Sequence, residues 1–248
     1  MKKIFQFSSQ PELLQYEELA DLKSSFEVIT NEQNLTPQQV LAQDFKIIEL
    51  GAGDFEKFLP YFSALDVKVS HLLVADTLVR QGSIYRPMNI LPEAVYSTVT
   101  DKVPKLKVSE PAVVVADYDF ALAMTYKLAQ SGFLKVIIAN DDVQSRKKIK
   151  SIIQQFVFGV EVVGISLEEL TELDSTNGLL ILNLRKEKNP EAHESITYFN
   201  FLTPNAVFVD LQSKKEESLI EEARRAELIV FSEAEILKTK YATILEMK

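Results

Sequence analysis

An acidic turn stands where a nucleotide-binding loop would hold glycines. The β-branched run Val113–Val115 is followed by Ala116-Asp117-Tyr118-Asp119 and then by a helical stretch at 120–130. A strand, a tight turn and a helix open the βαβ unit that binds dinucleotides, where glycines let backbone N–H groups approach a pyrophosphate. Here a tyrosine Cβ blocks that approach, and Asp117 and Asp119 place negative charge where the pyrophosphate would lie. The pattern therefore predicts the shape of such a unit with severely weakened dinucleotide binding.

Two other interpretations of this turn are open. The acidic pair together with Asn183, which ends the later run ILNL, resembles the magnesium pocket of a receiver domain. An asparagine cannot be phosphorylated, and the extra βα unit at 135–165 makes the chain too long for that fold. We favour the view that both aspartates cap the helix and solvate the turn. Tyr118 is expected to fill the volume of a cofactor or to stack on a different ligand.

Few other groups offer metal or nucleophilic chemistry. The chain has no cysteine, which excludes disulfides, thiolate catalysis and cysteine-ligated metal sites. The two histidines, His71 and His193, lie far apart in no ligand-spaced pattern, and we expect His71 to be a hydrogen-bonded strand residue. No metal site is predicted, although carboxylates alone could hold magnesium.

The charge balance argues against nucleic-acid and membrane partners. A formal net charge of −9 opposes binding to a phosphate backbone. The basic cluster at 146–150 lies beside Asp141 and Asp142 and is expected to be a solvated helix face. The N-terminal MKKIFQFSSQPELL breaks before any apolar stretch of signal-peptide length, and no transmembrane run follows. The expected location is therefore the cytoplasm.

Regularly alternating elements must position these residues. A chain of 248 residues, 46% of them hydrophobic, can bury a large core, and we expect two lobes. From residue 112 onward, runs such as LLILNL are typical of parallel strands buried on both faces. We predict a Rossmann-like doubly wound sheet, with strands at 113–116, 135–139, 160–165, 179–184, 206–211 and 228–231 and helices at 120–130, 143–156, 216–226 and 233–247.

The first half alternates less regularly. We predict strands at 3–7, 26–30, 45–50 and 67–74, and helices at 11–22, 36–42 and 54–65. Thr36 and Asp54 are expected to cap the last two helices, and Pro60 to break the third. The stretch 82–111, with four prolines, is expected to cross between the lobes. This gives an α/β substrate-type domain at 1–105 and a Rossmann-like domain at 106–248, whose closing helix could pack back on the first lobe.

The order of elements and several phrases resemble the shikimate dehydrogenase family over nearly the whole chain. VEVVGISLEELTEL followed by LLILNL is similar to the family's SLEEL segment and its I-N-A-T strand, with Asn183 at the asparagine. The stretch AVFVDLQSKKEESLIEEARRAELIVFSEAEIL is similar to the family's V-x-D strand, E-A-R-x-A-G helix and final helix. The resemblance implies a two-lobed α/β fold and, for a member that keeps the family's motifs, NAD(P)-dependent oxidation of shikimate or quinate.

The first half resembles the family's substrate lobe. Ser8-Ser9-Gln10-Pro11 is similar to the S-x-S-P motif whose serines hold the substrate carboxylate, with Ser8 kept and Gln10 in place of the second serine. The run 67–74 is similar to N-V-T-x-P-x-K. This correspondence implies Lys68 at the asparagine, Ser70 at the threonine and Val74 at the catalytic lysine. A valine cannot donate a proton.

Other family positions also differ in this chain. Asp101 is the nearest match to the second acidic catalytic residue, but it lies too close to the first Rossmann strand. Asn140-Asp141-Asp142 replaces an N-R-T motif whose arginine clamps the 2′-phosphate of NADP, so NAD is more plausible than NADP if either binds. Lys240 replaces a substrate-binding glutamine and could bind an anion, although a lysine on a C-terminal helix usually faces solvent.

These losses indicate a catalytically inactive member of the family that acts as a binding, scaffolding or regulatory module. We expect no bound cofactor and an unknown protein partner or small ligand. A homodimer is compatible with this interpretation. The alternative is an active NAD(P)-dependent shikimate or quinate dehydrogenase, in which a displaced group such as Lys68 or Asp101 transfers the proton. One fold hosts many functions, so the fold alone does not decide between them.

Overall fold

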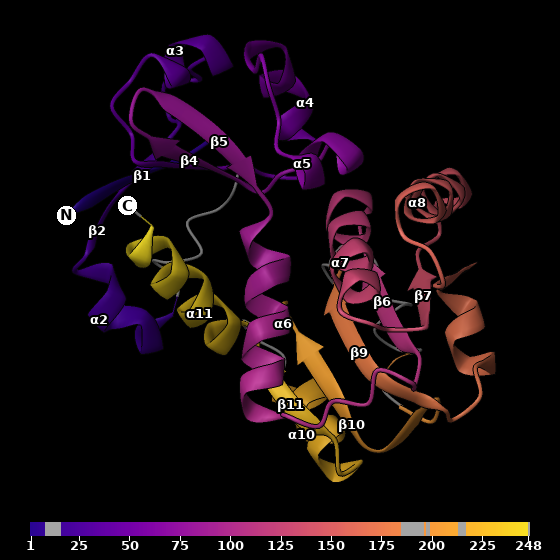
Figure 1. The fold of residues 1–248 in the computed structure, drawn as a ribbon. Coiled ribbons are helices and arrows are strands. Elements are labelled where there is room, and N and C mark those ends of the chain that lie inside the picture. The colour runs from indigo at the N-terminus through magenta and orange to yellow at the C-terminus, as the bar shows by residue number, and fades with distance from the viewer. Residues whose placement is uncertain (8–15, 185–195, 197–198, 213–216, 248) are drawn as a thin grey trace. The chain divides into compact units, whose positions relative to one another are not determined.

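The chain forms two compact units. The structure, a computed structural model, describes residues 1–7, 16–184, 196, 199–212 and 217–247 (Figure 1). Unit 1 comprises Met1–Ala94 with Leu237–Lys248, and unit 2 comprises Val95–Ile236. The chain passes between the units inside two helices, α6 (Ile90–Lys102) and α11 (Glu233–Glu246).

Unit 1 is built on a mixed five-stranded sheet in the order β2-β1-β3-β4-β5. β2 and β3 run parallel to β1, whereas β4 pairs antiparallel with β3 and β5 pairs antiparallel with β4. The strands are β1 (Lys2–Gln6), β2 (Phe26–Thr30), β3 (Ile47–Glu49), β4 (Thr77–Gln81) and β5 (Ile84–Met88).

The stretch 82–111 contains the passage between the units, as predicted, within α6, and it also contains the strand β5. Pro87 lies in β5, the edge strand, and Pro92 lies in the first turn of α6. Both are positions at which a missing N–H is tolerated. The prolines of this stretch are therefore compatible with regular structure as well as with the connection.

Short helices complete unit 1: η1 (Glu17–Leu19), α2 (Ala20–Lys23), α3 (Pro37–Leu41), α4 (Asp54–Phe58), η2 (Leu59–Tyr61) and α5 (Val67–Leu72). Thr36 caps α3 in a full capping box, as predicted. The α-helix from 54 ends before Pro60, also as predicted, but Gly53 holds its N-cap position and Asp54 is its first residue. Of the helix predicted at 11–22, residues 11–15 lie outside the described residues.

The strand predicted at 67–74 is wrong, because this run forms α5. The side chain of Asp66 accepts a hydrogen bond from the backbone N–H of Val69 at 3.0 Å and starts the helix. Leu73 then ends it in the left-handed conformation, at φ 54°. This local capping outweighed the alternating pattern Val-Lys-Val that had favoured a strand.

The two faces of the unit 1 sheet carry alternate strand residues. Phe5, Ile48 and Leu78 belong to one apolar core. Their neighbours Ile4, Ile47 and Val79 belong to a second core, to which the C-terminal half of α11 contributes Leu237, Tyr241 and Ile244. Residues from the end of the chain therefore complete the core of the first unit.

Unit 2 is a doubly wound sheet whose six strands are all parallel, in the order β11-β10-β9-β6-β7-β8. The strand order reverses between β6 and β9, which is the topological switch point of a Rossmann fold. The predicted α/β class is thus confirmed. The strands are β6 (Ala112–Ala116), β7 (Lys135–Ala139), β8 (Glu161–Ile165), β9 (Asn177–Asn183), β10 (Leu202–Asp210) and β11 (Ile229–Ser232).

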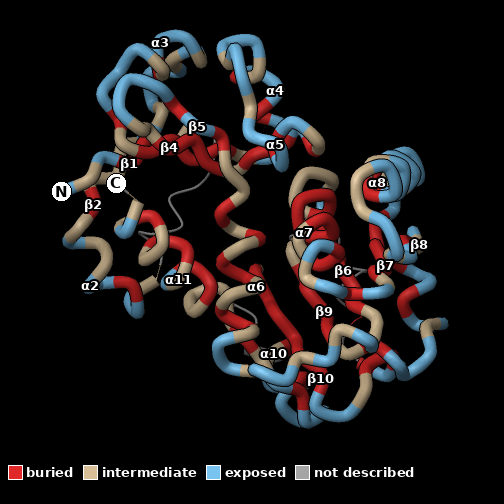
Figure 2. The backbone as a smooth tube through the Cα atoms, in the orientation of Figure 1, coloured by how far each residue is buried: buried red, intermediate tan, exposed pale blue. Residues whose placement is uncertain are grey.

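Helices cover both faces of this sheet. α7 (Tyr118–Gln130) and α8 (Val143–Phe156) lie side by side on one face (Figure 1). α10 (Glu217–Arg225) packs Leu219 and Ala223 on the other face, and the short η3 (Glu168–Glu172) follows β8. The central strands are buried and the outer side of α8 is exposed (Figure 2).

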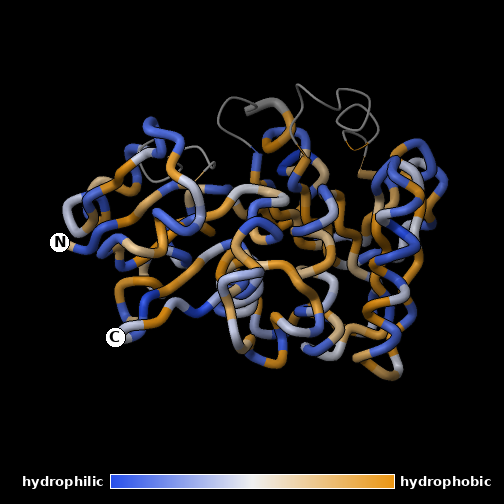
Figure 3. The backbone as a smooth tube through the Cα atoms, turned by 90° about the horizontal axis from the view of Figure 1, so that it is seen from above, coloured by the Kyte–Doolittle hydropathy of each residue, from blue (hydrophilic) through white to orange (hydrophobic). Residues whose placement is uncertain are grey.

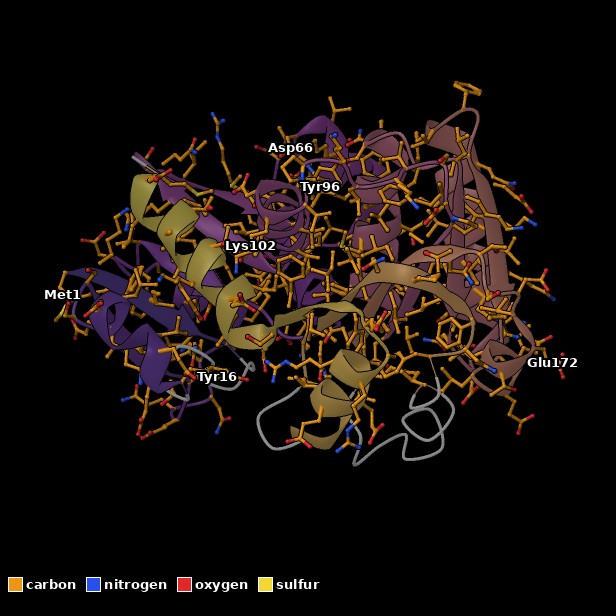
Figure 4. All side chains as sticks on the ribbon, turned by 90° about the horizontal axis from the view of Figure 1, so that it is seen from below. Met1, Tyr16, Asp66, Tyr96, Lys102 and Glu172 are labelled. Carbon is orange, nitrogen blue, oxygen red and sulfur yellow. The ribbon has the colours of Figure 1, made fainter. Side chains whose placement is uncertain are left out.

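The part of α6 in unit 2 is held by two of its neighbours. Lys127 of α7 lies over the ring of Tyr96, 4.8 Å from its centroid, and Lys102 pairs with Glu235 at the start of α11 (Figure 4). Hydrophilic and hydrophobic residues alternate closely along the chain (Figure 3). No helix in the described part of the chain is long and apolar enough to cross a membrane.

Candidate functional site

The switch point of unit 2 carries the acidic turn. β6 ends at Ala116 and α7 begins at Tyr118, so Asp117 is the single residue between them. Asp117 occupies the N-cap position with an exposed side chain, but that side chain accepts no capping hydrogen bond, contrary to our expectation. Asp119 follows in the first turn of α7. Carboxylates rather than glycines therefore stand at the helix N-terminus, where a pyrophosphate would bind.

Tyr118 makes a contact with α8. The Nζ of Lys148 lies 4.7 Å from the centroid of the tyrosine ring, in the geometry of a cation–π interaction. The ring is partly buried and lies beside the second βα unit. This contact uses one face of the ring that a ligand could otherwise stack on.

Asn140, at the end of β7, holds the strand ends together. Its Nδ2 donates to the carbonyl of Ala116 at 2.7 Å, and its Oδ1 accepts from the backbone N–H of Asp142 at 2.7 Å. Its own backbone N–H donates to the carbonyl of Ile165 at 3.1 Å. The residue is buried, and both polar atoms of its side chain form hydrogen bonds to backbone groups of the protein itself.

The two aspartates that follow are engaged with backbone N–H groups. Asp141 Oδ1 accepts from Leu167 at 3.0 Å. Asp142 caps α8 by accepting from the N–H of Gln144 at 2.9 Å and from the hydroxyl of Ser145 at 2.6 Å. Those hydrogen bonds, led by that of Ser145, hold the pKa of Asp142 below its usual value. Asp142 therefore carries its negative charge at the N-terminus of α8.

Asn183 and Asp210 end the neighbouring strands β9 and β10. Gln212 links them, because its Nε2 donates to Asn183 Oδ1 at 2.9 Å and its backbone N–H donates to Asp210 Oδ1 at 2.9 Å. Asn183 is paired in register with Ala116 of β6, so the predicted residues of this edge do converge on the switch point.

The charge of this edge is predominantly negative. Asp117, Asp119, Asp141, Asp142 and Asp210 supply carboxylates, whereas Arg146 and Lys148 supply the nearby cations. Within the described ranges, no three side chains of the metal-ligating types are grouped so that they could hold an ion. The carboxylates at this edge therefore outnumber the cations beside them.

Of the residues predicted for a substrate cleft, the structure describes Ser70 and Lys240, and it places them in different surroundings. Ser8 and Gln10 lie outside the described residues. Lys68 and Ser70 are exposed on α5: Lys68 Nζ pairs with Glu93 at 3.1 Å, and the Ser70 hydroxyl donates to the carbonyl of Val67 at 2.8 Å. Val74 is buried and follows Leu73, the residue that ends α5.

Two further predicted residues have other environments. Asp101 is exposed near the end of α6, in unit 2. His71 lies in the last turn of α5, so the expectation of a strand residue is wrong.

Lys240 is the predicted residue whose environment differs most from expectation. Its side chain is 6% exposed instead of facing solvent, and its Nζ lies 2.9 Å from Oε1 of Glu49, which is itself 3% exposed. Burial acts to raise the pKa of Glu49, but the charge of Lys240 and its hydrogen bonds outweigh burial and lower the pKa. The two residues form a buried ion pair within unit 1.

Sequence reasoning missed the rest of this buried group. Tyr241 donates its hydroxyl to both oxygens of Glu49, at 3.0 and 3.2 Å, and Gln6 Nε2 donates to Glu49 Oε2 at 2.9 Å. Gln6, Glu49 and Thr77 are paired in register across β1, β3 and β4. The one signal was a glutamate inside the apolar run IIEL, since an unpaired charge is rarely buried.

Asp76 is the second carboxylate near Lys240. Its pKa is raised by burial, although Lys240 acts in the opposite direction. Thr77 donates to Asp76 Oδ1 at 2.6 Å, and the N–H groups of Ile90 and Leu91 donate to Oδ1 and Oδ2 at 2.9 and 2.8 Å. Asp76 therefore caps α6, and its electrostatic neighbour is the same lysine that neutralises Glu49.

Comparison with known proteins shows similarity in fold. Neither a protein-family model nor a curated protein sequence matches the chain. Shikimate 5-dehydrogenase from Listeria monocytogenes, solved with shikimate and NAD, has a TM-score of 0.78 and 12% identity, with 99% of this chain and 90% of that chain covered. Quinate dehydrogenase from Corynebacterium glutamicum, solved with NAD, has a TM-score of 0.77 and 12% identity, with 98% and 90% covered.

A third solved structure carries a different activity on the same fold. Ligand-free 5-ketofructose reductase from a Gluconobacter species has a TM-score of 0.73 and 12% identity, with 99% of this chain and 91% of that chain covered. The chain therefore has the fold of shikimate and quinate dehydrogenases along nearly its full length. Substrate and activity have to be argued from its own residues.

Proposed function

We propose that this chain is a divergent member of the shikimate dehydrogenase family that does not catalyse NAD(P)-dependent hydride transfer and acts as a binding, scaffolding or regulatory module. The observation that carries the proposal is the single-residue connection from β6 to α7, with Asp117 at the N-cap and Asp119 in the first turn. A dinucleotide needs free backbone N–H groups and low negative charge there.

The neighbouring strand ends support the same view. Asn140, Asp141 and Asp142 direct polar atoms to backbone and hydroxyl groups of the protein itself. Lys240, which the resemblance places at a substrate-binding glutamine, is neutralised by Glu49 inside unit 1. Both elements that would hold cofactor and substrate are thus engaged internally. A protein partner or a small ligand other than a dinucleotide, and a homodimer, belong to this proposal.

A titration with NADH and NADPH tests it. Nucleotide fluorescence and thermal shift are followed on the full chain, and shikimate and quinate turnover is assayed with NAD and NADP. A ligand at a hundredfold excess over its Kd stabilises a protein by about 2.7 kcal/mol, which a melting curve detects. We expect no shift at millimolar nucleotide. A clear shift with either nucleotide would contradict the proposal.

An active dehydrogenase is the second candidate, and one ion pair favours it. Lys57 on α4 lies beyond the carboxyl end of β3, and its Nζ is 2.8 Å from Oδ1 of the buried Asp54. The Lys57 side chain is 59% exposed, so its ammonium could reach a ligand. A lysine beside a carboxylate is a plausible proton-transfer pair. If turnover is found, its loss in Lys57→Met but not in Lys68→Met would identify this pair.

A further inference from the structure

The end of the chain is docked on the beginning of the chain. Within unit 1, Leu237, Tyr241 and Ile244 form an apolar stripe with i, i+4 and i+7 spacing. The stripe packs on Ile4 and Ile47, from β1 and β3. Apolar contact of this kind is non-directional, so a helix that slid by one turn could bury a similar area.

A buried ion pair lies beside that stripe. Lys240 and Glu49 are 2.9 Å apart, with side chains 6% and 3% exposed. The Glu49 carboxylate also accepts from Tyr241 and Gln6, so three donor side chains converge on it. Lys240 and Tyr241 can both reach Glu49 at one helix register alone, because a shift by one turn would move Lys240 about 5.4 Å along the helix axis.

The far end of the same segment is fixed by a second lysine. Nζ of Lys2, in β1, donates to the carbonyls of Ile244, Leu245 and Met247 at 2.9, 2.6 and 3.0 Å. Ile244 and Leu245 lie in the last turn of α11 and Met247 follows it, so these carbonyls lack partners inside the helix. Lys2 thus holds the end of the helix, but carbonyls recur at every residue and would accept this lysine at several registers.

We propose that the buried Glu49–Lys240 pair is an ionic lock that sets the register of the C-terminal segment Leu237–Met247 on the sheet of unit 1. Breaking the pair from one side leaves a buried charge without its counterion, which the segment relieves by shifting or detaching. Replacing both partners by apolar residues restores stability without restoring register. The inference concerns unit 1 alone and stands whether or not a nucleotide binds unit 2.

The titration of the lock involves charged groups from several elements. Glu49 faces Gln6 of β1 and both Lys240 and Tyr241 of α11, while Asp76, ahead of β4, is the second carboxylate near Lys240. The pKa of Glu49 is lowered, so its stabilising effect is present above its unfolded pKa and is lost as the pH falls through its folded pKa. Burial raises the pKa of Asp76, so its contribution to stability changes with pH in the opposite direction. Acid should therefore open the lock in the wild-type chain.

Amide hydrogen exchange on the full chain tests the lock. Peptides spanning 237–247 are followed in the wild type, in Lys240→Met and in the double variant Glu49→Leu/Lys240→Met. Lys238→Met is the matched control, because Lys238 is exposed on the same helix. Peptides of α7, in unit 2, serve as the internal reference.

We expect Lys240→Met to speed exchange in 237–247 at least tenfold, with Lys238→Met unchanged. The double variant should melt at or above the temperature of Lys240→Met while its segment still exchanges at least tenfold faster than in the wild type. Its backbone NMR spectrum should show more than one set of peaks for the segment.

Wild-type protection and a single peak set in the double variant would overturn the lock, since apolar packing would then fix the register. If Lys240→Met does not fold, the double variant decides by the same two readouts. The wild type measured from pH 6 to pH 3, after correction for intrinsic exchange, gives an independent answer. Selective loss of protection in 237–247 supports the lock, and uniform loss across both units contradicts it.

Discussion

The side-chain amide of Asn140 donates to the carbonyl of Ala116 at 2.7 Å and so ties the end of β7 to the end of β6. The same side chain accepts from the N–H of Asp142 at 2.7 Å. Two strand ends that would frame a nucleotide are thus joined to one another by a residue that stands at the start of the family's N-R-T position.

Asn140→Ala should destabilise the chain. It leaves the buried carbonyl of Ala116 and the N–H of Asp142 without these partners, which costs about 1–3 kcal/mol for each buried group left unsatisfied. Urea unfolding followed by circular dichroism would measure the loss, with the exposed Gln154→Ala on α8 as control. An unchanged midpoint would show that water replaces both hydrogen bonds.

Removing the acidic turn should increase affinity for nucleotides. In Asp117→Gly/Tyr118→Gly/Asp119→Ala, the two carboxylates and the tyrosine Cβ are absent from the N-terminus of α7. Each exposed charge near a helix terminus contributes about 0.3–1 kcal/mol, so NADH should bind at least several-fold more tightly than to the wild type. NADH fluorescence titration checks this. The variant Asp101→Ala, which removes one exposed carboxylate on α6 instead of the two at the turn, is the control for a general loss of negative charge.

Single substitutions in the buried pair should be costly. Lys240→Met leaves Glu49 charged and buried, and breaking such a pair from one side costs about 3–5 kcal/mol. The double variant Glu49→Leu/Lys240→Met should recover most of that loss. Thermal melting of the variants at pH 7 would measure it, and equal melting temperatures for the single variant and the wild type would refute the estimate.

Acid stability should depend on Glu49. Because its pKa is lowered in the folded state, the wild type loses this contribution as the pH falls below about 4.3, the unfolded pKa. Glu49→Gln should therefore show a shallower fall in stability between pH 5 and pH 3. Asp76 acts with the opposite sign, since its pKa is raised, and Asp76→Asn should steepen the fall. Urea titrations at each pH check both slopes.

Lys57→Met should change stability little. The lysine side chain is 59% exposed, and an exposed ion pair contributes about 0.2–1 kcal/mol. The melting temperature should stay within a few degrees of the wild type, with Lys57→Arg as the conservative control. A larger loss would show that the buried Asp54 depends on this partner.

The sequence by itself determined the second half of the fold. Apolar runs buried on both faces indicate β6, β7, β9 and the 206–210 part of β10, and the strand–turn–helix at Asp117 marks the first βα unit. The missing glycines were also visible there. The same local logic placed α3, where Thr36 and Pro37 mark the start of a helix.

The tertiary structure alone decided the chemistry of unit 1. Residues 67–74 alternate like a strand but follow the capping aspartate Asp66 into α5, and no local pattern showed which tendency would prevail. The neighbouring residues in the sequence predict that Lys240 faces solvent. Its partner Glu49 lies on a strand far away along the chain. A charged side chain can be buried only where a counterion lies within reach, and the assembled unit provides that pairing whereas neither segment does so alone.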